Sequence, residues 1–159
     1  MVNFLDGNMF ELKSKYLINT VNCVGVMGKG IALQFKNRYP EMFIEYKRQC
    51  EEGKIDIGLP YIWENNDMFD PVTIINLPTK MHWKDPSKLI FIQKGLNWLE
   101  EYFKDKPDSS INMPALGCGC GGLDWDTVKH MIHEQLNPLE ATFYVYAPGG
   151  NAFTNEWRS

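Results

Sequence analysis

Short apolar runs alternate with amphipathic stretches along this chain, and this alternation restricts the fold more than any other feature of the sequence. The apolar runs are rich in β-branched and aromatic residues, and turn-forming residues bound most of them, as is typical of buried strands. Strands that alternate with helices form a mostly parallel or mixed sheet covered on both faces. The sequence therefore predicts one three-layer α/β/α domain around a mixed central sheet. Strands are expected at 17–21, 73–77, 111–113 and 142–146, with weaker ones at 2–4 and 61–63.

Four helices are expected between these strands, from the spacing of apolar residues and from residues that start or stop a helix. Proline inside a helical pattern ends the helix, whereas aspartate is a favoured N-cap and proline is favoured in the first turn. The first helix contains Ile31, Phe35 and Tyr39 and should end at Pro40, and the second is expected at 41–52. The third should start at Asp85 and Pro86, and the fourth near Trp125 after a cap at Asp124.

The length of 159 residues suits a single domain, which we expect to occupy residues 1–155. Residues 156–159 then form a short tail, which could be the truncated start of a longer chain. The N-terminus lacks a signal-peptide pattern, and no apolar run is long enough to cross a bilayer. We therefore expect a cytoplasmic protein without membrane contact.

The chain carries 16 Lys and Arg residues against 20 Asp and Glu residues, a formal net charge of −4. Nonspecific binding of DNA or RNA depends largely on neutralisation of phosphates by Lys and Arg. Long-range attraction will therefore not hold a nucleic acid to this chain. The four cysteines form no C-x-x-C pair and lack the partners of a zinc site, so we expect reduced thiols, no metal and no other cofactor.

Glycine-rich or polar residues directly follow the four stronger strands. Asn22 and residues 23–30 follow the first, Lys80 comes shortly after the second, residues 117–122 follow the third, and residues 147–151 follow the fourth. In open α/β sheets, ligands bind beyond the carboxyl ends of the strands. Glycine lets the backbone approach closely and point successive N–H groups into a concavity that suits an anion. One such loop could be a tight turn, but two on one edge predict a site for a nucleotide-like diphosphate.

Two common nucleotide-binding fingerprints are absent. Gly28-Lys29-Gly30 lacks the Ser or Thr that follows the lysine of a P-loop. The glycines of 117–122 have the wrong spacing for the dinucleotide-binding motif and come late in the chain. Neither a kinase nor a dehydrogenase is therefore indicated.

The runs 19–23, 28–32 and 114–119 together resemble the macrodomains, which bind ADP-ribose. Within that superfamily the chain is similar to the branch that contains the human terminal ADP-ribose glycohydrolase. It most resembles the DarG family of bacterial antitoxins, which remove ADP-ribose from thymidine in single-stranded DNA. The resemblance covers almost the whole chain. It implies a hydrolase of the N-glycosidic ADP-ribosyl–DNA bond, with ADP-ribosylated single-stranded DNA as substrate and a cognate ADP-ribosyltransferase toxin as partner.

The resemblance also assigns roles by position. Asn8 matches the residue that contacts the adenine edge, and Asn22 matches the asparagine near the distal ribose. Tyr146 either lies beside the adenosine or is a core aromatic residue at the end of a strand. The implied ADP-ribose-binding residues are Asn8, Met9, Thr20, Asn22, Val26, Met27, Gly28, Lys29, Gly30, Ile31, Leu116, Gly117, Cys118, Gly119, Cys120, Gly121, Gly122 and Tyr146.

Lys80 matches the lysine that related glycohydrolases require, and with Asn22 it completes the implied catalytic residues. A lysine that is desolvated by aromatic groups, or that lies near another cation, can lose its proton and act as a nucleophile. Lys80 could attack the anomeric carbon or trap the ring-opened sugar as a Schiff base. The nearby His82 and Trp83 either stack on an exposed base or pack over a surface groove.

One position departs from the pattern of the terminal ADP-ribose glycohydrolase, which has an aspartate in its second glycine loop that helps to release the product. The matching position here is Gly121, and Asp124 is either an N-cap or a substitute for that aspartate. A covalent lysine intermediate and lysine-assisted hydrolysis with a general acid from elsewhere therefore both stay open.

Two further functions fit the same fold. The chain could be a reader module that binds ADP-ribose without cleaving it, or a hydrolase of protein-linked or O-acetyl ADP-ribose. Slow or absent turnover would favour the reader, and a direct comparison of substrates would separate the two hydrolases.

Overall fold

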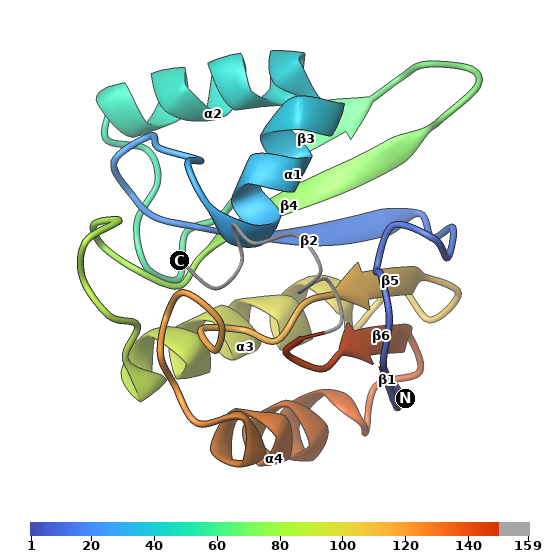
Figure 1. Ribbon diagram of the computed structural model, residues 1–159. Helices are drawn as coiled ribbons and strands as arrows, with labels where there is room; N and C mark the ends of the chain where they lie inside the picture. The colour runs from blue at the N-terminus through green and yellow to red at the C-terminus, as the bar shows by residue number, and fades with distance from the viewer. Residues whose placement is uncertain (150–159) are drawn as a thin grey trace.

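A six-stranded sheet lies between two pairs of helices in the computed structural model, which describes residues 1–149 (Figure 1). Helices α1 and α2 cover one face of the sheet, and α3 and α4 cover the other. The predicted three-layer α/β/α architecture is confirmed, and every expected strand is present. In chain order the elements are β1 (Val2–Leu5), β2 (Tyr16–Val21), α1 (Gly30–Arg38), α2 (Pro40–Glu51), β3 (Tyr61–Asn65), β4 (Val72–Pro78), α3 (Leu89–Phe103), β5 (Ser110–Met113), α4 (Trp125–Leu136) and β6 (Thr142–Tyr146).

The sheet is mixed, with the strand order β1-β6-β5-β2-β4-β3. Only the β3–β4 pair is antiparallel, and the other adjacent pairs are parallel. The carboxyl ends of β6, β5, β2 and β4 therefore lie next to one another along one edge. The segments that follow these strands meet at that edge.

The core consists of two apolar layers because side chains alternate between the two faces of each strand. Ile18 of β2 packs with the α3 and α4 side of the sheet, whereas its neighbour Leu17 packs with the α1 and α2 side. The predicted α3 stripe, Ile92, Leu96, Leu99 and Phe103, is fully buried against the first side.

Two helix starts differ from the prediction. The expected N-cap of α3 at Asp85 is wrong, because α3 begins at Leu89 with Lys88 as its N-cap. The reason is a distant contact: the Ser87 N–H donates to the Gly121 carbonyl oxygen (3.0 Å) and holds this segment outside the helix. Helix α2 begins at Pro40, one residue before the expected start.

The other helix signals are confirmed. Helix α1 ends at Arg38, before Pro40. Asp124 is the N-cap of α4 and accepts a hydrogen bond from the Thr127 backbone N–H at 3.0 Å. Among residues 1–149, no helix has the length and apolar character needed to cross a membrane. The expected domain end at 155, the tail 156–159 and the last two residues of the segment 147–151 lie outside the described residues.

Candidate functional site

A cavity of about 760 Å³ opens at the carboxyl ends of the parallel strands. This volume lies within the range of pockets that bind small molecules and cofactors. Its wall contains residues from the segments that follow β6, β5, β2 and β4, together with the first turn of α1. The two glycine-rich loops and Lys80, which are far apart in the sequence, therefore line one cavity as predicted.

The first glycine loop is shaped by Asn22, at the end of β2. The Asn22 side-chain amide donates to the Val26 carbonyl oxygen at 2.8 Å, and its oxygen accepts from the Val24 N–H at 3.0 Å. The hydroxyl of the buried Tyr46 on α2 lies 2.7 Å from the Asn22 carbonyl oxygen and 3.0 Å from its side-chain oxygen. Asn22 is 7% exposed, so its side chain organises the loop from within and lines the cavity at the same time.

The N-terminus of α1 faces the cavity without a side-chain cap. Its N-cap, Lys29, makes no capping hydrogen bond, and the first turn contains no acidic residue. The first N–H groups of a helix lack intrahelical partners and carry partial positive charge, which makes them a site for an anion. Gly30 and Ile31, at the start of this helix, are in the cavity wall. A Cβ atom added at Gly30 would lie 3.2 Å from the Cys120 Sγ atom, so the second glycine loop comes close to this helix start.

The second glycine loop is closely packed and excludes side chains at two positions. A Cβ atom at Gly121 would lie 2.3 Å from the Gly117 carbonyl oxygen and 2.4 Å from the Ser87 hydroxyl oxygen. Gly117 has a φ of +68°, and a Cβ atom there would lie 2.8 Å from both Ile92 and Leu123. The Leu123 N–H closes the loop with a 3.0 Å hydrogen bond to the Gly117 carbonyl oxygen. This loop can therefore offer main-chain groups to a ligand but no carboxylate from position 121.

Lys80 follows β4 in a segment that is tied to the first loop. The Thr79 N–H donates to the Val21 carbonyl oxygen at 2.9 Å, and the Cys23 N–H donates to the Met81 carbonyl oxygen at 3.0 Å. The half-buried Lys80 lines the cavity, and its Nζ atom lies 3.4 Å from the Trp83 carbonyl oxygen. Among residues 1–149, no carboxylate lies within ion-pair distance of Lys80, so its amine is available to a ligand.

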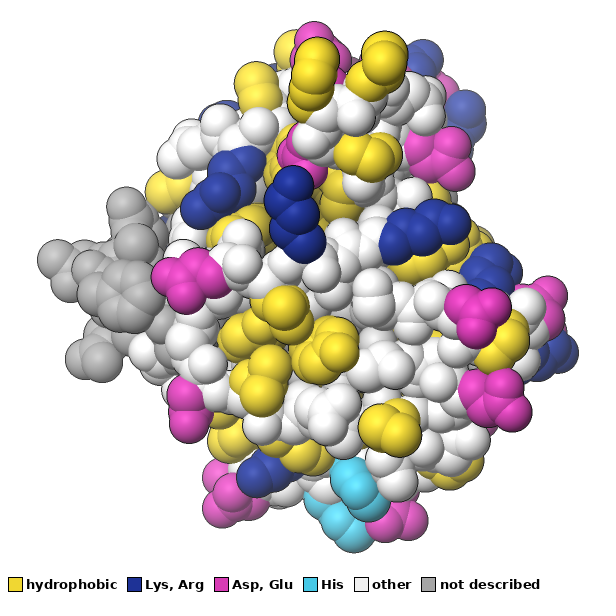
Figure 2. Space-filling view, turned by 90° about the vertical axis from the view of Figure 1, so that its right-hand side faces the viewer, with side chains coloured by type: hydrophobic (Ala, Val, Ile, Leu, Met, Phe, Trp, Pro, Cys, Tyr) yellow, Lys and Arg dark blue, Asp and Glu magenta, His cyan; other side chains and the backbone are white. Residues whose placement is uncertain are grey.

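The charge of the cavity wall is opposite to that of the whole chain. Lys29, Lys80 and Lys84 line the cavity, and Asp85 is the one carboxylate among the wall residues that the structure describes. Figure 2 views the molecule from the amino ends of the parallel strands, away from the cavity, and shows basic and acidic side chains intermingled there. The local excess of lysine in an acidic chain favours an anionic ligand.

Burial keeps two thiols of the glycine loops, Cys23 and Cys118, protonated. Burial raises the pKa of Cys23 to about 12, with a further contribution from Asp56. Burial also raises the pKa of Cys118 to about 12, with a contribution from Asp124. Because thiolates rather than thiols are the reactive species, these two cysteines are not nucleophiles near neutral pH. Burial, with Glu11, likewise raises the pKa of Tyr146, which stays a neutral phenol.

The structure brings most of the predicted site residues together in the wall. Met9, Met27 and Leu116 are exceptions, because their side chains are buried in the core and can contribute only main-chain groups. Asn8 lies outside the wall and accepts a hydrogen bond from the Phe10 N–H, and His82 also lies outside the wall, with its ring beside that of Trp83. The predicted residues in the wall are Thr20, Asn22, Val26, Gly28, Lys29, Gly30, Ile31, Lys80, Trp83, Gly117, Cys118, Gly119, Cys120, Gly121, Gly122 and Tyr146.

Several further residues line the cavity without a clear signal in the sequence. Gln34, on α1, lines the cavity, although its side-chain nitrogen is itself buried and has no hydrogen-bond partner among the described residues. Its position one turn after Gly30 was the signal that could have revealed it. The sequence leaves Lys84, like Trp83, open between the mouth of the site and a surface groove, and predicts Asp85 as a helix start, because the fold of their segment depends on a distant contact. The other missed residues are Val21, Ala32, Thr79, Pro86, Pro114, Ala115, Ala147 and Pro148.

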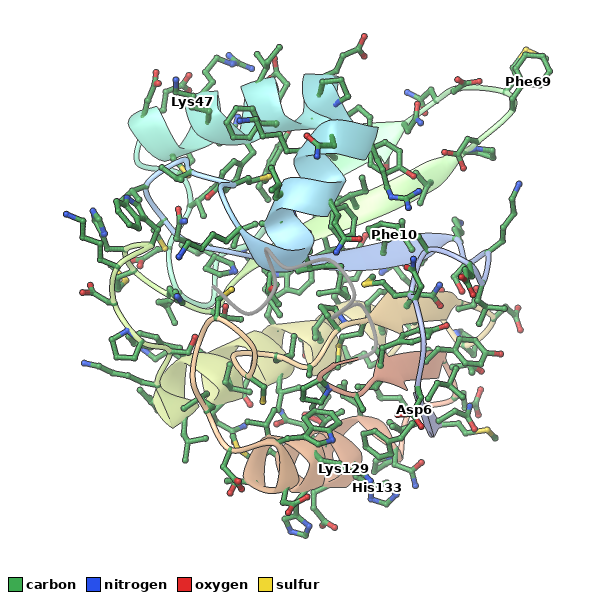
Figure 3. All side chains as sticks on the ribbon, in the orientation of Figure 1. Asp6, Phe10, Lys47, Phe69, Lys129 and His133 are labelled. Carbon is green, nitrogen blue, oxygen red and sulfur yellow. The ribbon has the colours of Figure 1, made fainter. Side chains whose placement is uncertain are left out.

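No group of three or more His, Cys, Asp or Glu side chains that could hold a metal ion occurs in residues 1–149. His130 and His133 are exposed on α4, and Figure 3 shows His133 on the outer side of that helix.

Comparisons with known proteins agree with this geometry. The family model described as Macro domain matches residues 18–132. A Mycobacterium tuberculosis protein named DNA ADP-ribosyl glycohydrolase is 43% identical over 155 residues, which cover 96% of this chain and 44% of that protein. The chain thus spans less than half the length of this relative.

Two further proteins are similar over most of the chain. The solved macrodomain of Thermus aquaticus DarG matches with a TM-score of 0.86 and 42% identity, and the match covers 93% of this chain and 99% of that one. A Thermosipho africanus protein, named as a fusion of DNA ADP-ribosyl transferase and DNA ADP-ribosyl glycohydrolase, is 32% identical over 162 residues, or 92% of this chain and 42% of the fusion. The fold, the glycine-rich cavity and these matches agree, and the chain belongs to the macro domain family.

Proposed function

We propose that the chain is an ADP-ribosyl glycohydrolase that releases ADP-ribose from a modified base in DNA. The observation that carries this proposal is the position of the Lys80 amine in the wall of a cavity that also contains the uncapped start of α1 and the main chain of both glycine loops. The names of the relatives from M. tuberculosis and T. africanus support both the reaction and the DNA substrate.

The diphosphate of ADP-ribose is expected between the two glycine loops. The uncapped start of α1 lies on one side, and the main chain of 117–122 lies on the other. Both elements bind anions through backbone N–H groups. The wall lysines add positive charge.

The reaction adds one water molecule across the bond between C1 of the distal ribose and a nitrogen of the base. The hydroxyl group ends on C1, and the proton ends on the base nitrogen. In a covalent route, the Lys80 amine bonds to C1 as the bond to the base breaks, and water then cleaves the adduct. In a direct route, water attacks C1 while Lys80 binds the sugar. Sodium cyanoborohydride distinguishes the two routes, because it reduces a Lys80 Schiff base to an adduct that mass spectrometry locates.

Asp85 is the candidate to stabilise the transition state. Cleavage of glycosidic bonds passes through an oxocarbenium-like state, which a nearby carboxylate stabilises. The second glycine loop cannot supply this group, because a side chain at Gly121 would clash with the Gly117 backbone. Asp124 is engaged as the α4 N-cap, through the Thr127 N–H and hydroxyl group.

The proposed substrate is ADP-ribosylated thymidine in single-stranded DNA, and the proposed partner is the transferase that attaches the group. The T. africanus relative, whose name joins a transferase and a glycohydrolase, supports a shared pathway of modification and removal. Such a chain would act as the antitoxin of that transferase.

A release assay on a thymidine-ADP-ribosylated oligonucleotide tests the proposal. We expect free ADP-ribose and the unmodified oligonucleotide from the wild-type chain, and neither product from Lys80→Ala. Tight ADP-ribose binding without turnover of any substrate would instead identify a reader module. Turnover of O-acetyl or protein-linked ADP-ribose alone would identify a different hydrolase.

A further inference from the structure

The strand order sets the order of the groups along the cavity. Neighbouring strands lie about 4.8 Å apart, so the ends of β6 and β4, three strands apart in the sheet, are separated by roughly 14 Å. Tyr146 ends β6, Lys80 follows β4, and the two glycine loops follow the strands between them. If the diphosphate lies between the loops and the distal ribose lies at Lys80, the adenosine extends toward Tyr146. The group attached to the distal ribose then lies beyond Lys80, at the β4 end.

Trp83 occupies that end of the cavity. It and Tyr146 are the two aromatic residues of the described wall, but Tyr146 is 6% exposed and Trp83 is 46% exposed. The Lys80 Nζ atom lies 3.4 Å from the Trp83 carbonyl oxygen, which places this residue next to the proposed reacting amine. An indole that is half exposed at a cavity wall can still bury a face against a ligand.

The neighbours of Trp83 fix its position and add charge. The His82 ring packs beside it, with centroids 5.5 Å apart and planes tilted by 32°. The Lys84 and Asp85 N–H groups donate to His82 Nδ1 at 3.2 Å and to the His82 carbonyl oxygen at 3.1 Å, which makes residues 82–85 a tight turn. The Lys84 ammonium lies 5.0 Å from the Trp83 ring centroid and also lines the cavity. An aromatic face and a cation are thus presented together.

We propose that Trp83 and Lys84 form the subsite for the leaving group: the modified nucleobase stacks on the Trp83 indole, and the Lys84 ammonium binds a neighbouring phosphate of the strand. This inference rests on the proposed function and extends it to substrate selection. His82 does not touch the substrate in this arrangement but supports the Trp83 ring. A planar base has a π-face to stack on the indole, whereas an acetyl group or a carboxylate ester has none.

The test compares two substrates with different leaving groups. Trp83→Ala should lower kcat/KM on a thymidine-ADP-ribosylated oligonucleotide about tenfold or more. The same variant should hydrolyse O-acetyl ADP-ribose at the wild-type rate, if the wild type hydrolyses it, and bind free ADP-ribose with unchanged Kd. Trp83→Phe should recover most of the activity on the oligonucleotide, because it restores an aromatic face.

Phe69→Ala provides a matched control, since it also removes an exposed aromatic ring. Phe69 is 89% exposed, and Figure 3 shows it at the tip of the β3–β4 hairpin, pointing away from the rest of the molecule. This variant should match the wild type on both substrates. Lys84→Ala should weaken binding of the oligonucleotide more at low salt than at high salt, because a phosphate contact is screened by ions.

A binding measurement separates this inference from the proposed function. In the Lys80→Ala background, Trp83→Ala should still weaken binding of the uncleaved oligonucleotide about tenfold. Loss of this difference would overturn the subsite even where the wild type is an active glycohydrolase. An equal loss on both substrates, or a weaker Kd for free ADP-ribose, would also overturn it, because Trp83 would then contact ADP-ribose itself. Absence of turnover by the wild type, with the binding difference intact, would overturn the proposed reaction alone.

Discussion

The two segments that meet beside the cavity, residues 80–87 after β4 and residues 117–122 after β5, contribute in opposite ways. The first presents side chains to the cavity: an amine, an indole, an ammonium group and a carboxylate. The second presents mainly backbone, and a side chain is sterically excluded at Gly117 and Gly121. A hydrogen bond from the Ser87 N–H to the Gly121 carbonyl oxygen joins them. Under the proposed function, the first segment carries the chemistry and the second binds ADP-ribose, so mutations should separate the two.

Lys80→Ala should have the largest effect on turnover and almost none on binding. Removal of a group that acts directly at the reacting carbon lowers kcat by about 10³-fold or more. The Kd for ADP-ribose, measured by calorimetry, should stay within about twofold, because the main-chain groups of the two loops remain and a change that small is well below 1 kcal/mol.

Two further variants define what Lys80 contributes. Lys80→Arg retains the positive charge but not a nucleophilic amine, so activity should be lost here as well. Lys129→Ala removes an exposed lysine of α4 (Figure 3) and should leave both kcat and Kd unchanged. Wild-type turnover by Lys80→Arg would reduce the role of Lys80 to that of a charge.

In contrast to Lys80→Ala, Gly121→Ala should weaken ADP-ribose binding and lower the stability of the fold. The added methyl group would meet the Gly117 carbonyl oxygen at 2.3 Å, so the loop must move. Overpacking of this kind lowers the free energy of unfolding by about 1–3 kcal/mol, and a displaced diphosphate loop should weaken ADP-ribose binding by about tenfold, or 1.4 kcal/mol. Urea unfolding and calorimetry measure the two effects.

Gly28→Ala makes the same substitution in the first glycine loop. A Cβ atom there meets only Val26, at an ordinary 3.6 Å, and Gly28 has no positive φ. The free energy of unfolding should therefore stay at the wild-type value. If both substitutions lowered the free energy of unfolding equally, the second glycine loop would not be packed more tightly than the first.

Asp85→Asn should have a smaller effect, confined to the chemical step. If Asp85 stabilises positive charge on the sugar, kcat should fall about tenfold, which corresponds to about 1.4 kcal/mol of transition-state stabilisation. The affinity for the anionic ADP-ribose should stay the same or rise slightly, because a negative charge leaves the wall. Steady-state kinetics with the modified oligonucleotide measure kcat, and an unchanged value would leave the reaction without an identified carboxylate.

The strands could be predicted from local patterns, whereas part of the site could not. The buried runs of β2 and β4 and the cap at Asp124 are local signals, and the structure confirms them. The start of α3 depends instead on the contact between Ser87 and Gly121, which are 34 positions apart, so the local pattern at Asp85 gave the wrong result.

Local and distant signals also decide which residues of the candidate site could be predicted. Residues of the two glycine loops were identified because glycine marks backbone that must turn or approach a ligand. Gln34 belongs to a residue type that is common on any surface, and only the fold places it in the wall, while for Lys84 the fold decides between the site and a surface groove. The family resemblance predicts Met9 and Met27 as binding residues, but the structure buries both side chains in the core.

Asp124→Ala should have the smallest effect, and it tests the claim that this carboxylate is structural. Loss of an N-cap lowers the free energy of unfolding by about 1 kcal/mol, which in a protein of this size lowers Tm by about 2–4 °C. Both the kcat on the oligonucleotide and the Kd for ADP-ribose should equal the wild-type values, because the Asp124 side chain is bonded to Thr127 and lies outside the cavity wall. A loss of kcat without a loss of stability would instead show that Asp124 serves the reaction, and the catalytic carboxylate would then belong to the segment after β5 rather than to the segment after β4.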